Sequence, residues 1–289
     1  MMYLNQRKVD MKKLVLLDLD RTLIDDEYHL NVPLEHLKKS LKEAESRSLT
    51  IGISSDSSAE TISAYEKLCG LSGPIVAEKG AYLTRGPDIG NGVLTIKQTS
   101  IFPVVRKKFV KKLLIDPRVL VIHGDVNEIS RLFPNLPCNN CSSSKAVLVN
   151  NSRRASLSFY VYRKIANLWR TDRAILSMVC DEARRILRDE SRILADNTHI
   201  DLNAKCGICI IHHNQTNKSL ALPTLRRWYP THQIFAIGDS LTDYYKNDSV
   251  IHCAVGNANE QFKRQCQIVA SRNYTAGVIE LMRKISCFS

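Results

Sequence analysis

The sequence has no long hydrophobic run. Nowhere among its 289 residues do about 18 apolar residues follow one another without a charge, so no transmembrane helix is predicted. The amino-terminal stretch MMYLNQRKVDMKK also lacks the apolar core of a secretory signal. Internal repeats and low-complexity tracts are missing as well. With 44% hydrophobic and 24% charged residues, the composition is typical of a soluble globular protein. We therefore expect a cytoplasmic protein of one large or two ordinary domains, with no membrane partner.

The sequence also lacks a recognised nucleic-acid-binding motif with interleaved aromatic residues. Its formal net charge is nevertheless +12, and residues 84–204 carry most of the excess, with 20 Lys and Arg against 11 Asp and Glu. The densest cluster is RKKFVKK, residues 106–112. A solvated basic face is the common explanation for such clusters, and an anionic small substrate is a second one. We do not expect nucleic acid as a partner.

A disulfide framework is not indicated either. The nine cysteines are odd in number and lie in apolar segments of a chain without a secretory signal, which favours reduced thiols. Two pairs have C-x-x-C spacing, Cys138 with Cys141 and Cys206 with Cys209. Zinc is an open alternative for them, but a structural zinc site needs four converging ligands. The second pair lies in the strand-like run CGICII, where cysteine behaves as a small hydrophobic residue, so ordinary packing is expected.

Strand and helix signals alternate in the first third of the chain. The apolar run at residues 15–17 predicts a buried strand, because strands covered on both faces are continuously apolar. Helix-like and strand-like segments then alternate at residues 33–47, 49–54, 57–70 and 74–83. This β-α-β-α-β rhythm predicts right-handed crossovers and a doubly wound, Rossmann-like parallel sheet. The same pattern resumes with strands at 207–211 and 233–239, a helix at 217–229 and a strand at 252–257. Two more helices are expected, in ANEQFKRQ and TAGVIELMRK.

A second domain is expected between these two stretches. The turn-rich segment TRGPDIGNG, residues 84–92, ends the first β-α pattern. Beyond it, residues 119–124 and 155–162 resemble strands, and 171–190 forms an amphipathic helix pattern that Thr171 or Asp172 could cap. We therefore expect an α/β core in residues 1–83 and 205–289, with an inserted α+β domain in residues 84–204.

Two carboxylates follow the first predicted strand, which is an unfavourable place for charge. Asp18 and Asp20 come directly after an apolar strand, where burial raises the free energy of each charged group. One residue separates them, so both lie on the same face of an extended segment. Ligands of open α/β sheets bind at the carboxyl ends of the strands, which is where these acids are expected. Either a cation lies beside them or they take part in chemistry.

Three further segments are expected at the same sheet edge. Ser54 ends the second strand, Lys218 begins the helix after residues 207–211, and Asp239 with Asp243 follow the strand at 233–239. In order and in residue type, these segments resemble the four motifs of the haloacid dehalogenase superfamily. DLDRT is similar to its D-x-D-x-T, Ser54 to its motif-two hydroxyl, Lys218 to its motif-three cation, and GDSLTD to its G-D-x-x-x-D.

The place of the insertion narrows the resemblance. It falls between the second and third motifs, as in the subclass with a type IIB cap, often called Cof-type sugar phosphatases. VAEKGAYL resembles the Glu-Asn-Gly turn of that subclass and AVGNANEQFK its V-G-N-A segment. Sucrose-phosphate and mannosyl-phosphoglycerate phosphatases have the same architecture. The resemblance covers the whole chain and implies a phosphatase whose cap domain selects the substrate.

The resemblance also implies a role for each motif residue. Asp18 would be the nucleophile that forms an aspartyl-phosphate, and Asp20 would protonate the leaving oxygen and then activate water. Magnesium would be held by the Asp18 side chain, the Asp20 backbone carbonyl and Asp239, while Asp243 would orient metal-bound water. Such a cation offsets the repulsion between a carboxylate and a phosphate dianion.

Ser54, Ser55 and Lys218 would hold the phosphoryl oxygens, and Lys218 would stabilise the negative charge that develops on them. The expected substrate is a small phosphorylated metabolite, and the expected assembly is a monomer or a homodimer.

Several positions depart from the family pattern. Ser55 and Asp56 stand where Gly and Arg are common, Lys79 where Asn is usual, and Thr242 where Asn often precedes the last Asp. Arg21 replaces the frequent Gly of D-x-D-G-T. Asp56 could pair with Lys79 or Arg21.

Two other functions stay open. A phosphotransferase similar to phosphomannomutases would share this cap type, but those enzymes carry an Arg shortly after the first motif, where this chain has Asp26 and Glu27. A catalytically degenerate polyanion-binding module would explain the basic middle segment and the motif-two changes. The presence of all four catalytic residue types argues against that second alternative.

Overall fold

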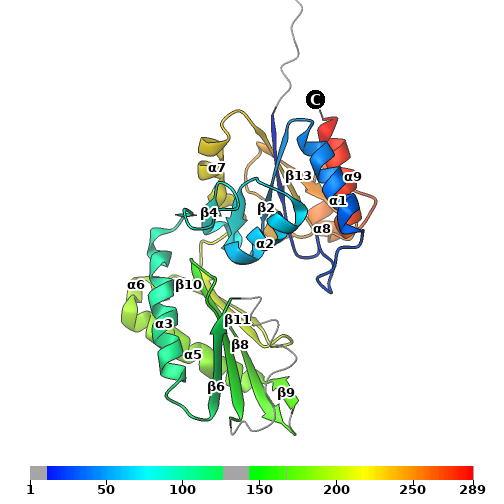
Figure 1. Ribbon diagram of the computed structural model, residues 1–289. Helices are drawn as coiled ribbons and strands as arrows, with labels where there is room; N and C mark the ends of the chain where they lie inside the picture. The colour runs from blue at the N-terminus through cyan, green and yellow to red at the C-terminus, as the bar shows by residue number, and fades with distance from the viewer. Residues whose placement is uncertain (1–11, 126–142, 167, 289) are drawn as a thin grey trace, which may run out of the picture. The chain divides into compact units, whose positions relative to one another are not determined.

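The computed structural model describes residues 12–125, 143–166 and 168–288 (Figure 1). Two compact units are present. The first takes the chain up to Asp56, then Ile62–Gly92 and Asn217 onward, and the second takes Ser57–Thr61 and Val93–Thr216. The second unit is thus an insertion into the first, although its edges fall some residues beyond the expected 84 and 204.

The first sheet is mainly parallel, as its β-α alternation predicts. Those of its strands that belong to the first unit lie in the order β14-β13-β12-β1-β2-β3-β4, and neighbours from β14 to β3 are parallel, while β4 is antiparallel to β3. The strands are β1 (Lys13–Leu17), β2 (Leu49–Ser54), β3 (Ile75–Ala77), β4 (Tyr82–Thr84), β12 (Gln233–Gly238), β13 (Val250–Ala254) and β14 (Ile268–Val269).

Helices and short 3-10 turns connect these strands. They are α1 (Leu34–Glu45), α2 (Ala59–Cys69), η1 (Glu78–Gly80), η3 (Lys218–Ala221), α7 (Leu222–Trp228), η4 (Leu241–Asp243), α8 (Glu260–Lys263) and α9 (Tyr274–Ser286). The doubly wound α/β core predicted from the sequence is confirmed.

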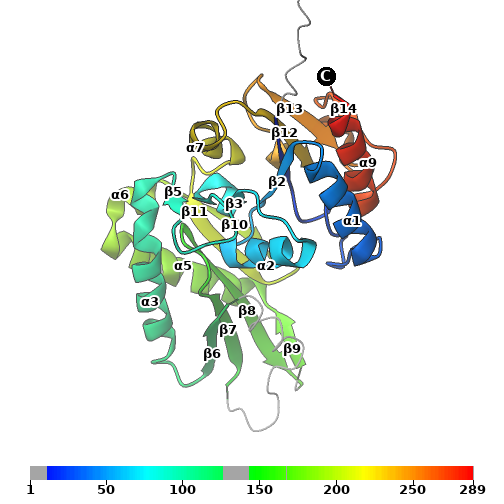
Figure 2. The same cartoon turned by 45° about the horizontal axis from the view of Figure 1, so that its top comes forward.

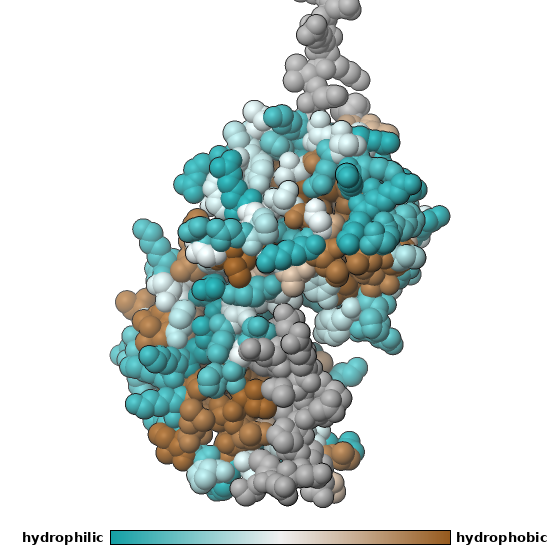
Figure 3. Space-filling view, in the orientation of Figure 1, coloured by the Kyte–Doolittle hydropathy of each residue, from teal (hydrophilic) through white to brown (hydrophobic). Residues whose placement is uncertain are grey.

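The two faces of β1 pack against different helices, so every residue of this strand is buried. Leu14 and Leu16 lie in a cluster with Leu222 and Leu225 of α7. Because strand side chains alternate, Lys13, Val15 and Leu17 point to the other face. Two helices pack together there, α1 and α9, which lie side by side in Figures 1 and 2. Hydrophilic residues predominate on this part of the surface in Figure 3, as expected for amphipathic helices.

A buried lysine joins the start of β1 to the end of α9. The ammonium group of Lys13 donates to the backbone carbonyls of Ile285 at 3.0 Å, Ser286 at 3.3 Å and Phe288 at 2.6 Å. The last carbonyls of a helix have no partner within it, and a cation beside them also interacts favourably with the helix dipole. Lys13 thereby fixes the carboxy-terminal helix against the central strand.

We expect Lys13→Met to lower the free energy of unfolding by roughly 1–3 kcal/mol, because it leaves buried carbonyls without a charged donor. Urea unfolding would measure the change. Lys12→Met is the matched control, because Lys12 is exposed. Equal stability of the two variants would contradict the role given to Lys13.

The second unit is an antiparallel sheet, apart from one parallel pair, with helices on one face. Its strand order is β10-β11-β8-β7-β6, with β9 paired to β8 and with β6 parallel to β7. The elements are β5 (Val93–Leu94), η2 (Lys97–Ile101), α3 (Phe102–Leu113), β6 (Val119–Gly124), β7 (Lys145–Asn150), β8 (Ser156–Ile165), β9 (Leu168–Thr171), α5 (Arg173–Glu190), α6 (Arg192–Asp196), β10 (Thr198–Asn203) and β11 (Ile208–His213).

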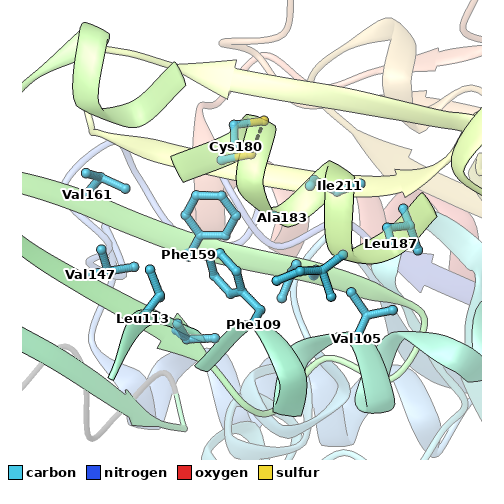
Figure 4. Close-up of a cluster of buried hydrophobic side chains, with 14 of the residues drawn as sticks. Val105, Phe109, Leu113, Val147, Phe159, Val161, Cys180, Ala183, Leu187 and Ile211 are labelled. Atoms are coloured by element: carbon cyan, nitrogen blue, oxygen red, sulfur yellow. Dashed lines mark hydrogen bonds between the residues drawn. The ribbon is translucent and has the colours of Figure 1, made fainter. Parts of the chain in front are cut away.

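One hydrophobic core joins α3 and α5 to this sheet (Figure 4). The rings of Phe109 and Phe159 are 5.0 Å apart at its centre. Asp172 caps α5 by accepting a hydrogen bond from the Ile175 amide at 3.0 Å, which decides between the two expected caps. The expected inserted α+β unit is present.

The cysteines of the second C-x-x-C pair have different surroundings. Cys209 is fully buried in this core, with its sulfur 3.4 Å from that of Cys180, whereas Cys206 is exposed. Cys209 therefore packs as a hydrophobic residue, and among the described residues no cysteine belongs to a group that could hold a metal ion. Cys138 and Cys141 lie outside the described residues.

One strand was predicted in the wrong sheet. The apolar run at 207–211 does form a strand, β11, but β11 pairs with β8 and β10 of the second sheet. An apolar run shows that a strand is buried and carries no signal for which sheet it joins. Lys218 therefore follows the return of the chain from the second unit and does not follow a strand of the first sheet.

Among the described residues, no helix is both long enough and apolar enough to cross a membrane.

A buried carboxyl group in α2 makes the stability of the first unit depend on pH. Glu66 has no exposed surface, and burial raises its pKa from 4.5 to about 8, which the amide of Ile53 offsets only in part. Between these pH values the folded chain keeps a proton that the unfolded chain has lost. Stability therefore falls as pH rises from about 4.5 to about 8.

We expect Glu66→Gln to remove this pH dependence. Relative to the unsubstituted protein, the variant should gain roughly 3 kcal/mol in unfolding free energy between pH 5 and pH 8. Urea unfolding at both pH values measures this gain, with the exposed Glu43→Gln as the control. Parallel stability curves for the variant and the unsubstituted protein would refute the assignment.

Candidate active site

Three adjacent strands end at one edge of the first sheet, and several of the expected site residues lie at or directly after these strand ends. Asp18 follows β1, Ser54 ends β2, and Asp239 follows β12. Their order in the sheet is β12-β1-β2, and the Asp18 amide donates to the carbonyl of Ile237 at 2.9 Å. The side chains therefore meet because parallel strands end at the same edge.

Lys218 connects these segments. Its ammonium donates to Asp18 Oδ1, to the Ser54 carbonyl and to Asp243 Oδ1, each at 2.7 Å. The side chain is only 5% exposed, and Asp18 lies 200 positions away in the sequence. A lysine ammonium has three hydrogens, so these three acceptors use all of them.

The pKa values in this cluster reflect both burial and neighbouring charge. Burial alone lowers the pKa of Lys218, but the Asp18 and Asp243 carboxylates outweigh it and raise the pKa above its usual value. For Asp18, burial and then the Asp243 charge raise the pKa, and Lys218 opposes them. Burial and the Asp243 charge raise the pKa of Asp239 to about 6. One lysine thus does not fully offset three buried acids.

The three acids fit a divalent cation. Oxygen atoms of Asp18, Asp239 and Asp243 lie within 4.8 Å of one another, and among the described residues they form the one group of this kind close enough to hold a metal ion. Carboxylate oxygens are ligands that hard cations such as Mg²⁺ prefer. The excess negative charge around Lys218 is the kind of environment that such a cation stabilises.

Asp243 also shapes the loop between β12 and η4. Its Oδ2 accepts the amides of Asp239 and Ser240, both at 3.0 Å, in a capping box with Ser240. Gly238 is required beside it, because a Cβ there would lie 2.4 Å from the Asp243 Cβ. Asp243 therefore orients Asp239 and Lys218 at the same time.

The η1 turn, with the sequence EKG at residues 78–80, packs against the segment that begins with Lys218 and positions it. Gly80 has a φ of +86°, and a Cβ on it would lie 2.5 Å from the Asn217 carbonyl oxygen. Asn217 in turn accepts the Ser219 amide at 3.0 Å and begins η3 at Lys218. Only glycine allows the turn to approach so closely, which gives a physical reason for the Gly of this segment.

Asp20 and Ser55 are placed differently from the residues around Lys218. Asp20 is partly exposed and its carboxylate lies outside the group of three acids. Ser55 is fully buried, with its amide donating to Val76 O at 2.9 Å and its carbonyl accepting the Lys79 amide at 3.2 Å. The roles expected for both residues stay predictions.

The structure adds Tyr245, which the sequence interpretation missed. Its hydroxyl lies 2.7 Å from Ser54 Oγ, and the side chain is 1% exposed. The available signal was its place, two residues after Asp243, but an aromatic residue there reads equally well as part of the core.

Arg21 and Asn257 were also missed as parts of the site. The Nε of Arg21 lies 3.2 Å from Asp26 Oδ1 and 3.7 Å from Asp239 Oδ2. The side-chain amide of Asn257 donates to the backbone carbonyl of Arg21 at 2.7 Å, so the AVGNAN segment contacts the first motif directly. Arg21 has a φ of 60°, the left-handed conformation that favours the glycine common at this position. A pairing of Asp56 with Lys79 or Arg21 stays a hypothesis.

A sequence model of haloacid dehalogenase-like hydrolases matches residues 15–282. The chain belongs to this family. No curated protein matches the sequence.

Solved structures of family members and related proteins share the fold. A haloacid dehalogenase-like hydrolase from Bacteroides thetaiotaomicron aligns over 95% of this chain and 99% of its own, with 15% identity and a TM-score of 0.62. A Thermoplasma acidophilum protein aligns over 96% and 100%, with 19% identity and a TM-score of 0.59. A protein described as a subclass IIB sugar phosphatase aligns over 96% and 100%, with 14% identity and a TM-score of 0.53. The similarity to the family thus includes the inserted unit.

We expect MgCl₂ to raise the unfolding temperature by roughly 5 °C when its concentration is about 100 times the Kd. Asp239→Asn should abolish this rise. In EDTA the same variant should be at least as stable as the unsubstituted protein, because it removes one of three mutually repelling buried acids. Asp248→Asn, an exposed carboxylate, is the control and should respond normally. A full magnesium response in Asp239→Asn would refute a cation site at these residues.

Proposed function

We propose that the chain is a magnesium-dependent phosphomonoesterase that acts on a small phosphorylated metabolite, with a sugar phosphate as the first candidate. The observation that carries the proposal is the Lys218 ammonium held between Asp18 and Asp243, beside Asp239. A buried carboxylate with cationic charge on one side and room for a divalent cation on the other is suited to attack a phosphate dianion.

The hydrogen bond that Lys218 donates distinguishes the two Asp18 oxygens. Lys218 holds Oδ1, so Oδ2 is the atom that attacks phosphorus. The P–O bond to the leaving group breaks as the Asp18–phosphorus bond forms, and Asp20 gives its proton to the leaving oxygen. Asp20 then takes a proton from water, which attacks phosphorus and releases Asp18 and inorganic phosphate. Each step is easier than direct attack by water.

The remaining residues balance charge and position the phosphoryl group. The Asp18 and Asp239 carboxylates and the Asp20 backbone carbonyl would hold Mg²⁺, which when bound supplies positive charge against the phosphate dianion. The Lys218 hydrogens already have acceptors, so Lys218 contributes mainly charge. The hydroxyls of Ser54 and Ser55 are then the neutral donors to the phosphoryl oxygens.

Two features support the substrate class. The first is the likeness in fold to a protein described as a subclass IIB sugar phosphatase. The second is the basic excess of residues 84–204, which suits an anionic substrate. The same excess is the specific observation in favour of a polyanion-binding module without catalysis.

The test is phosphate release from p-nitrophenyl phosphate and a panel of phosphorylated metabolites, with MgCl₂ and with EDTA. We expect metal-dependent turnover that falls at least about a thousandfold in Asp18→Asn, which lacks the nucleophile. Asp248→Asn, which changes an exposed carboxylate outside the group of three acids, should keep full activity. Transfer of phosphate to a second sugar would indicate the phosphotransferase. Folded protein that releases nothing but binds polyanions in a salt-sensitive manner would indicate the binding module.

A further inference from the structure

Tyr245 and Ser54 form a buried hydroxyl pair, and the Ser54 carbonyl accepts a hydrogen bond from Lys218. The two oxygens are 2.7 Å apart, and the two residues are 2% exposed or less. Ser54 ends β2, whereas Tyr245 follows the η4 turn that carries Asp243. This contact therefore joins the expected phosphate-binding segment to the loop with the acids, through residues 191 positions apart.

The Tyr245 ring is held on several sides. It packs in the cluster that contains Leu14 and Leu16 of β1. Its backbone amide donates to His252 Nε2 at 3.0 Å, and its carbonyl accepts the Asn247 amide at 2.7 Å. A ring fixed in this way presents its hydroxyl from a constant position, which a positioning residue requires.

The chemistry of the neighbouring groups bears on which hydroxyl, that of Tyr245 or that of Ser54, donates the hydrogen bond between them. Lys218 has no hydrogen left for Tyr245, because Asp18, the Ser54 carbonyl and Asp243 accept all three. The tyrosine hydroxyl carries one hydrogen that it can donate. A phenol is more acidic than an alcohol and is the stronger donor. The 2.7 Å distance fits either direction, and the greater acidity of the phenol favours Tyr245 as the donor and Ser54 as the acceptor.

We infer that Tyr245 is a positioning residue for phosphate recognition: its hydroxyl donates to Ser54 Oγ and directs the Ser54 hydrogen toward a phosphoryl oxygen. The inference rests on the proposed function, because it needs a phosphoryl group beside Ser54. A serine hydroxyl without such a partner rotates among three positions and can turn its hydrogen to nearby carboxylates or carbonyls. The Tyr245 bond removes that freedom before the substrate arrives.

The experiment is a double-mutant cycle of the unsubstituted chain, Ser54→Ala, Tyr245→Phe and both changes together. Tyr245→Phe keeps the ring, and it should lower kcat/KM and the affinity for inorganic phosphate about tenfold, the value of one hydrogen bond to a charged group. In the Ser54→Ala background the same change should have no further effect. Tyr244→Phe is the matched control and should be neutral.

Several results would overturn the inference. They are an equal loss from Tyr245→Phe in both backgrounds, no loss in the unsubstituted chain, or a smaller loss from Ser54→Ala than from Tyr245→Phe. Urea unfolding checks that each protein is folded. If Tyr245→Phe does not fold, Ser54→Ala alone must weaken phosphate binding, and unchanged binding refutes the inference.

A failure of the positioning role can be distinguished from a failure of the proposed function. Turnover sensitive to Asp18→Asn, together with additive Tyr245 and Ser54 effects, rejects the positioning role and keeps the phosphatase. If no compound is turned over, calorimetric binding of inorganic phosphate in MgCl₂ to the same four proteins still gives the cycle. An unsubstituted chain that binds no phosphate overturns the inference.

Discussion

The candidate site depends on one buried cation between two buried carboxylates. Lys218 lies between Asp18 and Asp243 at 2.7 Å from each, with very little exposed surface on any of the three. Burying one of these charges without its partner is strongly unfavourable, and together they are tolerated because all three Lys218 hydrogens have acceptors. The contact also has a structural effect, since it joins the ends of β1 and β2, the loop after β12 and the point where the chain re-enters the first unit.

Unusual backbone geometry surrounds this ion pair. Glu78, Lys79 and Gly80 all have positive φ in the turn beside Lys218, and Arg21 has one in the loop after Asp18. Such conformations cost free energy for residues other than glycine and persist where the surroundings fix them, commonly at functional sites. The Arg21 position links this strain to charge, because its guanidinium lies beside Asp26 and Asp239. Arg21, at a position where glycine is common, thus adds a positive charge beside two carboxylates.

The inserted unit is held together by a hydrophobic core. Its helices α3 and α5 pack through aromatic and aliphatic side chains onto a mostly antiparallel sheet, and Cys180 with Cys209 fills part of that core. The apolar run at residues 207–211 joins this sheet, which explains why the sequence boundary at 204 came too early. Hydrophobic patterning decides that a segment is buried, but partners far along the chain decide which sheet it enters.

The sequence by itself determined the parallel core, the insertion and the acids at the strand ends. These follow from local patterns: apolar runs, helix periodicity and charged residues directly after strands. Tertiary structure alone decided that Tyr245 contacts Ser54, that Asn257 holds the Arg21 carbonyl, and that all three Lys218 hydrogens have acceptors. Each of these contacts joins residues more than 20 positions apart, and their geometry comes from packing between elements, which no local pattern encodes.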